Sequence, residues 1–229
     1  MSSSEDPRRY LAPAAFVDSD AENVVAWSRQ AAGEGDDVAR AVRLYYAVRD
    51  GITYTPYCDF RSPETYRASA CLDRRAGFCV AKASLLAAGA RAAGLPARLG
   101  FADVRNHLCT PRLRALVGGD VFYYHGFVEL FLRGRWVKAT PAFDRALCDR
   151  FGVHPLEFDG LDDSLFHPYD RSGRRHMEYV RERGVYLDVP VADIVAIFER
   201  FYPGLMEAGA AAAAPASRFR EEAERLPAD

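Results

Sequence analysis

The chain has 229 residues, of which 49% are hydrophobic and 27% are charged, a balance that suits a globular protein with one substantial core. Its 30 lysines and arginines nearly match its 32 aspartates and glutamates, and the formal net charge is −2. No overall positive field would therefore attract nucleic acid or an anionic membrane surface, and composition argues against both partners.

The N-terminal residues Met1–Asp6 lack the basic and apolar regions of a signal peptide, and no apolar run reaches the length that spans a bilayer. We therefore expect a cytoplasmic protein. The chain has five cysteines, Cys58, Cys71, Cys79, Cys109 and Cys148. Because their number is odd and no two of them form a Cys-x-x-Cys pair, the sequence argues against a disulfide framework and against a structural zinc site. The histidines at 154, 167 and 176 are spaced too irregularly to predict a metal, and no cofactor is predicted.

The first part of the chain is predicted to be mainly helical. Residues 1–19 are polar and contain prolines, which predicts a loosely attached lead-in. Apolar residues at helical spacing predict helices over 21–32 and 36–50. Asp36 or Asp37 is expected to cap the second helix. The aromatic and proline-containing stretch 51–70 has no regular period and is expected to be an ordered loop.

Cys79 follows the turn Arg74–Phe78 and opens a predicted helix through Val80–Gly94, which Pro96 keeps from continuing. A cysteine at a helix N-terminus has its sulfur near unsatisfied N–H groups, where negative charge is favoured. Because the thiolate is the nucleophilic form of cysteine, Cys79 is a candidate nucleophile. The alternative is a buried, inert thiol.

A β-hairpin is predicted downstream of a strand over residues 97–104. The alternate residues of Val121–Leu132 separate onto two faces, which predicts a second strand. The Arg-Gly dipeptide after it can form a two-residue turn into a return strand over 135–140. This turn sets the register, in which Glu129 is expected to face Lys138 as an opposite-charge pair.

His125 lies on a defined face of this hairpin. If the register continues, His125 faces Ala142 and has Thr140 and Asp144 as its two diagonal neighbours. Of these residues, only Asp144 can supply a carboxylate. A polar cluster over residues 103–107 is expected to cap turns rather than to reach a site.

The remainder of the chain is predicted to be loop-rich from residue 145 up to a helix over 190–201. The segment 206–229 is alanine-rich and then charged, which predicts a flexible tail. We therefore expect a single domain over residues 1–205, with its core motifs within 50–145.

Cys79, His125 and Asp144 occur in the order expected of a Cys-His-Asp site built on a helix and a neighbouring sheet. Each residue type has a role in acyl transfer: a thiolate attacks the acyl carbon, an imidazole takes and returns the proton, and a carboxylate holds the imidazole tautomer.

These motifs resemble the core of the transglutaminase-like superfamily, which is shared with papain-fold cysteine enzymes. The resemblance covers residues 50–145 and is specific as a combined pattern. It is carried by Gly77-Phe78-Cys79, the helix end Arg91–Arg98, His125–Phe131, Gly134-Arg135-Trp136 and a threonine-proline step. It implies an α+β fold in which the nucleophile helix packs on an antiparallel sheet that carries the histidine and the acid.

The sequence departs from the family pattern at the acid. In many members the acid lies four residues after the tryptophan, and here that position is Thr140, followed by Pro141. Asp144 is the nearest replacement and is assigned as the acid. If it does not serve, Thr140 or an acid from the loop 159–163 would have to orient His125.

The resemblance predicts a thiol enzyme that forms a thioester at Cys79 with an amide or other acyl substrate and passes the acyl group to water or an amine. The backbone N–H of Cys79 would be one oxyanion donor. One alternative is an arylamine N-acetyltransferase, whose Arg-Gly-Gly-Phe-Cys motif Arg75–Cys79 partly matches. A second is a non-catalytic binding protein on a decayed thiol-enzyme fold, which the threonine at 140 favours.

Overall fold

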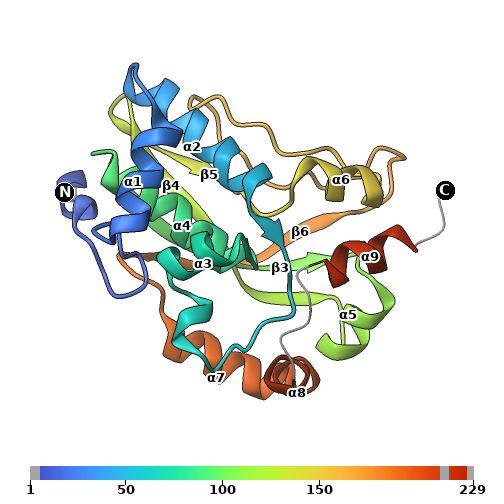
Figure 1. Cartoon of the computed structure of the whole chain (residues 1–229). Coiled ribbons are helices and arrows are strands. Elements are labelled where there is room, and N and C mark those ends of the chain that lie inside the picture. The colour runs from blue at the N-terminus through green and yellow to red at the C-terminus, as the bar shows by residue number, and fades with distance from the viewer. Residues whose placement is uncertain (1–5, 212–216, 226–229) are drawn as a thin grey trace, which may run out of the picture.

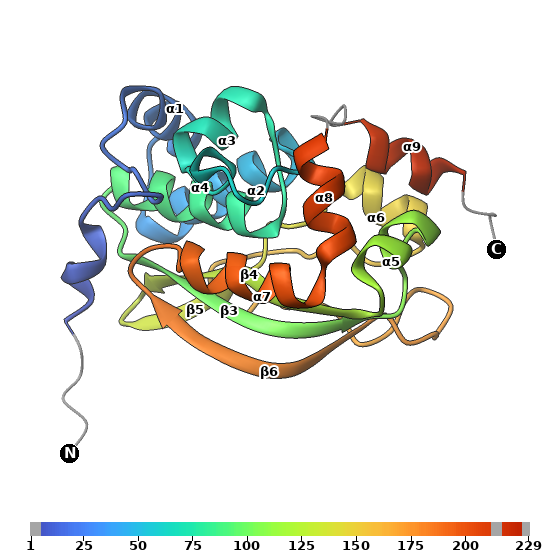
Figure 2. The same cartoon turned by 90° about the horizontal axis from the view of Figure 1, so that it is seen from below.

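A computed structural model describes residues 6–211 and 217–225 of the chain. A layer of helices lies against one face of a four-stranded antiparallel sheet, whose strands run in the order β5-β4-β3-β6 (Figure 1, Figure 2). The predicted α+β class, with the nucleophile helix on an antiparallel sheet, is therefore confirmed.

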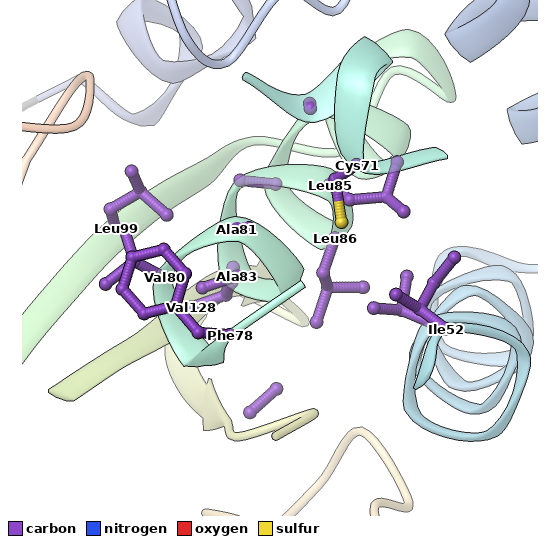
Figure 3. Close-up of a cluster of buried hydrophobic side chains, with 14 of the residues drawn as sticks. Ile52, Cys71, Phe78, Val80, Ala81, Ala83, Leu85, Leu86, Leu99 and Val128 are labelled. Atoms are coloured by element: carbon purple, nitrogen blue, oxygen red, sulfur yellow. The ribbon is translucent and has the colours of Figure 1, made fainter. Parts of the chain in front are cut away.

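The helical layer consists of α1 (Glu22–Ala32), α2 (Asp37–Gly51), α3 (Ala68–Arg74) and α4 (Cys79–Ala92). Asp36 caps α2, because its carboxylate accepts a hydrogen bond from the backbone N–H of Ala39 at 2.8 Å. Every residue of α4 from Val80 to Arg91 is buried, which explains the small and apolar composition of that helix. Figure 3 shows Val80 of α4 beside Leu99 and Val128 of the sheet.

The sheet consists of β3 (Ala97–Asn106), β4 (Val121–Leu132), β5 (Arg135–Ala139) and β6 (Met177–Tyr186). The predicted hairpin is confirmed, and Glu129 faces Lys138 in the ladder. The carboxylate of Glu129, however, binds the guanidinium of Arg98 at 2.6 Å. The pairing ends at Ala139, because Pro141 cannot donate to a ladder, so the expected continuation to Ala142 and Asp144 does not form.

The other elements are short. They are the 3-10 helices η1 (Pro7–Leu11) and η2 (Pro63–Thr65), the parallel pair β1 (Thr53–Tyr54) and β2 (Ala76–Gly77), and the helices α5 (Pro111–Val117), α6 (Arg145–Phe151), α7 (Val191–Phe201), α8 (Pro203–Ala211) and α9 (Arg218–Glu224). The predicted helix over 190–201 is confirmed as α7. None of the helices in the described ranges combines the length and the apolar content that crossing a membrane requires.

Two stretches that were expected to be loops contain regular structure. Residues 51–70 include the start of α3, and the region after 145 contains α6 and β6. β6 pairs with β3 at the edge of the sheet and leaves most of its side chains exposed. An edge strand with so little buried surface carries no apolar alternation, which is why its sequence gave no strand signal.

The lead-in is packed rather than loosely attached over its described part. Tyr10 and Val17 are buried. The carboxylate of Asp188 accepts hydrogen bonds from the backbone N–H groups of Phe16 at 3.1 Å and Val17 at 3.0 Å. The prediction for residues 6–19 was therefore wrong, and residues 1–5 lie outside the described ranges.

The segment 206–229 is not simply a flexible tail. It contains the end of α8 and all of α9, in which Met206, Phe219 and Ala223 are buried. In Figure 2 these helices lie beside α5 and α6. The folded unit therefore extends past residue 205, while 212–216 and 226–229 lie outside the described ranges.

Candidate active site

Cys79 is the first residue of α4, where backbone N–H groups have no partner within the helix. Phe78 before it is fully extended, with φ −86° and ψ −179°, so the chain enters the helix directly from β2. Cys79 is half-buried, and all five cysteines of the chain are unpaired. The structure thus confirms the predicted place of this thiol at a helix start.

Gly126 lets β4 approach the start of α4. A Cβ atom at this position would lie 3.0 Å from the Cα of Val80 and 3.4 Å from its backbone nitrogen. Any side chain here would push the strand away from the helix. The absence of a side chain at 126 therefore brings the residue next to it, His125, to the N-terminal end of the cysteine helix.

A β-bulge in β4 lies immediately before His125. The register between β3 and β4 shifts by one residue around Asp103. Tyr124 has φ +54°, which is uncommon for a residue other than glycine. Bulges redirect the side chains that follow them and occur often beside functional sites. This one sets the direction of the imidazole.

An ion pair supports the bulge. The carboxylate of Asp103 accepts a hydrogen bond from the backbone N–H of Tyr124 at 3.2 Å and binds the guanidinium of Arg183 of β6 at 2.8 Å. Asp103 was expected to cap a turn in the polar cluster 103–107. It instead holds the strand segment that carries His125.

Cys79 and His125 line one cavity with a volume of about 60 Å³. This space is larger than one water molecule needs. The hydrogen bonds of the described residues include none between Sγ of Cys79 and the imidazole. The two side chains therefore share one cavity without a hydrogen bond between them.

Both groups are uncharged at neutral pH. Burial raises the pKa of the Cys79 thiol to about 11, an effect that the backbone N–H groups of Gly126, Val80 and Cys79 itself oppose. Burial lowers the pKa of His125 to about 4. The resting groups are therefore a neutral thiol and a neutral imidazole that line the same cavity.

Among the described residues, no carboxylate forms a hydrogen bond or ion pair with His125. Nε2 of His125 is buried and has no hydrogen-bond partner among the described residues. Thr140 follows directly on β5 and is 1% exposed. The residue at the position of the expected acid is thus buried at the end of β5, where its hydroxyl interacts with the phenol of Tyr179 of β6.

Asp144 lies apart from this arrangement. It is the N-cap of α6, where its Oδ1 accepts a hydrogen bond from the N–H of Leu147 at 3.0 Å, and its Oδ2 binds Arg220 of α9 at 3.1 Å. No hydrogen bond joins Asp144 to His125 among the described residues. The structure brings Cys79 and His125 together, whereas the assignment of Asp144 as the orienting acid stays a prediction without a contact to support it.

Replacing Asp144 with alanine is expected to lower the free energy of unfolding by about 1 to 2 kcal/mol, because α6 loses its cap. Its effect on acyl transfer should stay far below the hundredfold or more expected of a residue that orients a catalytic imidazole. Urea unfolding and initial rates measure the two effects. Asp149→Ala, which removes an exposed carboxylate from the same helix, is the control. A large loss of rate with an unchanged free energy of unfolding would contradict this prediction and indicate that Asp144 orients the imidazole.

The sequence matches the model of the transglutaminase-like superfamily over residues 25–141, about half of the chain. The chain belongs to the transglutaminase-like superfamily. The matched segment includes the cysteine helix, His125 and Thr140, and it ends just before Asp144. A search of the curated proteins found no significant match.

A solved structure shares the fold of this transglutaminase-like chain. It is a candidate cysteine protease from Cytophaga hutchinsonii, with a TM-score of 0.50 and 16% sequence identity. The similarity covers 82% of this chain and 49% of that one, so this chain spans about half the length of its structural neighbour. At this identity the similarity establishes the architecture alone.

Several cavity residues gave no functional signal in the sequence. Phe166 comes from the stretch predicted as loop, Phe143 lies just before that stretch, and Phe219 comes from the predicted tail. Isolated aromatic residues in irregular segments are read as packing, because nothing in their local spacing shows which surface they meet. Only the folded chain brings them beside Cys79.

Proposed function

We propose that this chain is a thiol enzyme that takes an acyl group from an amide or ester onto Cys79 and passes it to water or an amine. The observation that carries the proposal is the meeting of Cys79, at the start of α4, and His125, on β4, in one cavity. The family and the fold support a thiol-enzyme function of this general kind.

In the first step His125 accepts the proton of the Cys79 thiol while Sγ attacks the carbonyl carbon of the donor. A carbon–sulfur bond forms, and the bond from carbon to the leaving nitrogen or oxygen breaks. The proton held on His125 passes to the leaving group. The products are a thioester on Cys79 and a free amine or alcohol.

In the second step water or an amine attacks the thioester carbon, and His125 accepts the proton of the attacking group. The carbon–sulfur bond breaks, and the proton returns to the thiolate of Cys79. The products are a carboxylic acid or a new amide, together with the free enzyme. Both outcomes use the same intermediate, so the choice depends on which acceptor enters the cavity.

The backbone around the sulfur is suited to the negative charge of these steps. The N–H groups of Cys79, Val80 and Gly126 lie near Sγ, where they favour negative charge. An oxyanion that forms on the attacked carbon would be stabilised by donors of the same kind. These amides are held by α4 and β4, so the donors need not rearrange during the reaction.

The proposed catalytic unit is a Cys79–His125 pair rather than a full Cys-His-Asp triad. Thr140 occupies the sequence position at which many members of the family carry the acid, and Asp144 caps α6. Without a nearby carboxylate, burial alone sets the pKa of His125 at about 4. The imidazole therefore stays neutral down to mildly acidic pH and keeps a free lone pair over the whole physiological range.

Turnover of p-nitrophenyl butyrate tests the proposal. We expect the wild-type protein to release p-nitrophenol and butyrate, and to form the hydroxamic acid when hydroxylamine is added as the acceptor amine. Cys79→Ser should abolish both reactions, while Cys109→Ser, a half-buried cysteine that does not line the cavity, should not. A Cys79→Ser protein that keeps its rate would contradict the proposal.

A non-catalytic binding protein is the second candidate, favoured by the threonine at position 140 and by the neutral state of Cys79 and His125. It predicts that the same ester binds without release of p-nitrophenol. Turnover that depends on Cys79 would exclude it.

A further inference from the structure

The cavity beside Cys79 is almost entirely apolar. Among the described residues that line it, none is aspartate, glutamate, lysine or arginine. Apart from Cys79 and His125, its walls are apolar or aromatic, with Asn106 as the one amide; they include Phe60, Phe78, Phe122, Met177, Phe198 and Leu205. A charged group placed here would lose its water without gaining an ionic partner.

A row of ring contacts runs from the catalytic imidazole to the C-terminal helix. The ring centroids of His125 and Phe166 are 5.0 Å apart, and those of Phe166 and Phe143 are 5.4 Å apart. Phe143 meets Tyr54 at 4.9 Å, and Tyr54 meets Phe219 of α9 at 5.5 Å. All five side chains line the cavity. Phe219 is thus the last ring in this series of contacts, and it meets Tyr54, whose strand pairs with Gly77 just before Cys79.

Polar contacts of the two residues Arg220 and Glu222, which follow Phe219, hold α9 in place. Arg220 binds Asp144 at 3.1 Å. Glu222 accepts a hydrogen bond from the hydroxyl of Tyr57 and pairs with Arg112 at 3.4 Å. Phe219 itself is only 2% exposed. This short helix therefore fixes one aromatic ring against the cavity.

We propose that the acyl group accepted by Cys79 is apolar and uncharged, and that Phe219 forms the end wall of its pocket and limits the length of the acyl chain. This inference rests on the proposed function. The acyl carbon lies at Sγ, the chain extends along the rings of Phe166, Phe143 and Tyr54, and the ring of Phe219 stops it. Phe219 is a specificity-determining residue, and Asp144 positions it through Arg220.

Acylation by p-nitrophenyl esters of different acids tests this assignment. Sγ bonds to the acyl carbon, the carbon–oxygen bond breaks, and p-nitrophenolate leaves and is measured by its colour. We expect the wild-type protein to react with the butyryl ester about tenfold or more faster than with the octanoyl or the succinyl ester. Phe219→Ala should raise the ratio of octanoyl to butyryl rates about tenfold or more, with succinyl still slow. Phe219→Leu should shift this ratio in the same direction by less.

Phe131→Ala, which removes a ring from β4 outside the cavity, is the matched control and should leave the chain-length profile unchanged. A profile that Phe219→Ala and Phe219→Leu both leave unchanged would overturn the inference. So would equal acceleration of every ester, succinyl included, because α9 would then only obstruct entry. These results differ from failure of the proposed function, in which Cys79→Ser reacts with every ester as fast as wild type.

Discussion

Replacing His125 with alanine is expected to lower the rate of Cys79 acylation by about 10²- to 10⁴-fold. Burial holds the pKa of the Cys79 thiol at about 11, so only about one thiol in a thousand is ionised at pH 8 in the absence of a base. His125 removes this barrier by taking the proton as Sγ attacks. The measurement is the initial rate with p-nitrophenyl butyrate at pH 8.

The pH dependence of the His125→Ala protein provides a second readout. Without the base, the remaining rate should rise with pH towards the pKa of the thiol near 11, whereas the wild-type rate should already be high at neutral pH. His167→Ala, which removes an exposed histidine outside the cavity, is the control and should behave as wild type. A His125→Ala protein within threefold of the wild-type rate would remove His125 from the mechanism.

Acidification from pH 7 to pH 4 is expected to destabilise the fold by several kcal/mol. Burial lowers the pKa of both His125 and His176 to about 4, from an ordinary value of 6.5. Between these values the unfolded chain binds protons at both positions and the folded chain does not. Stability rises with pH wherever the unfolded state binds more protons, so it falls on acidification. Each histidine contributes at most about 3 kcal/mol to the loss of unfolding free energy between pH 7 and pH 4.

Urea unfolding between pH 7.5 and pH 4 measures this effect. His125→Gln and His176→Gln should each flatten the dependence of the unfolding free energy on pH, because each removes one group that titrates only in the unfolded chain. Near pH 4 these variants should lose less of their own stability than wild type. An unfolding free energy that stays constant from pH 7 to pH 4.5 would show that neither histidine is held neutral by the fold.

The hairpin of β4 and β5 shows what the sequence can predict. Its two-residue turn and regular faces fixed the bounds of β4 and the pairing of Glu129 with Lys138, since turn and register are local properties. The same reasoning failed beyond Ala139. Pro141 ends the ladder, and Asp144, which an extended register would place beside His125, turns away to cap α6.

The walls of the site could not be predicted in this way. Phe219 lies in an alanine-rich and charged segment and 140 positions after Cys79. Its place in the cavity depends on contacts that α9 makes with α6 and with the loop around Tyr57, such as the pair of Arg220 with Asp144. Such contacts leave no period in the sequence. The bulge at Tyr124 is equally hidden, because it depends on Asp103 and Arg183 of two other strands.

The central claim is that Cys79 carries the acyl group. Intact-protein mass spectrometry after brief reaction with p-nitrophenyl butyrate and acid quenching tests it directly. We predict one added butyryl group, mapped by peptide analysis to Cys79, which is lost on treatment with hydroxylamine and does not form in Cys79→Ser. An unmodified protein under conditions of turnover, or a butyryl group on one of the other four cysteines, would contradict the account.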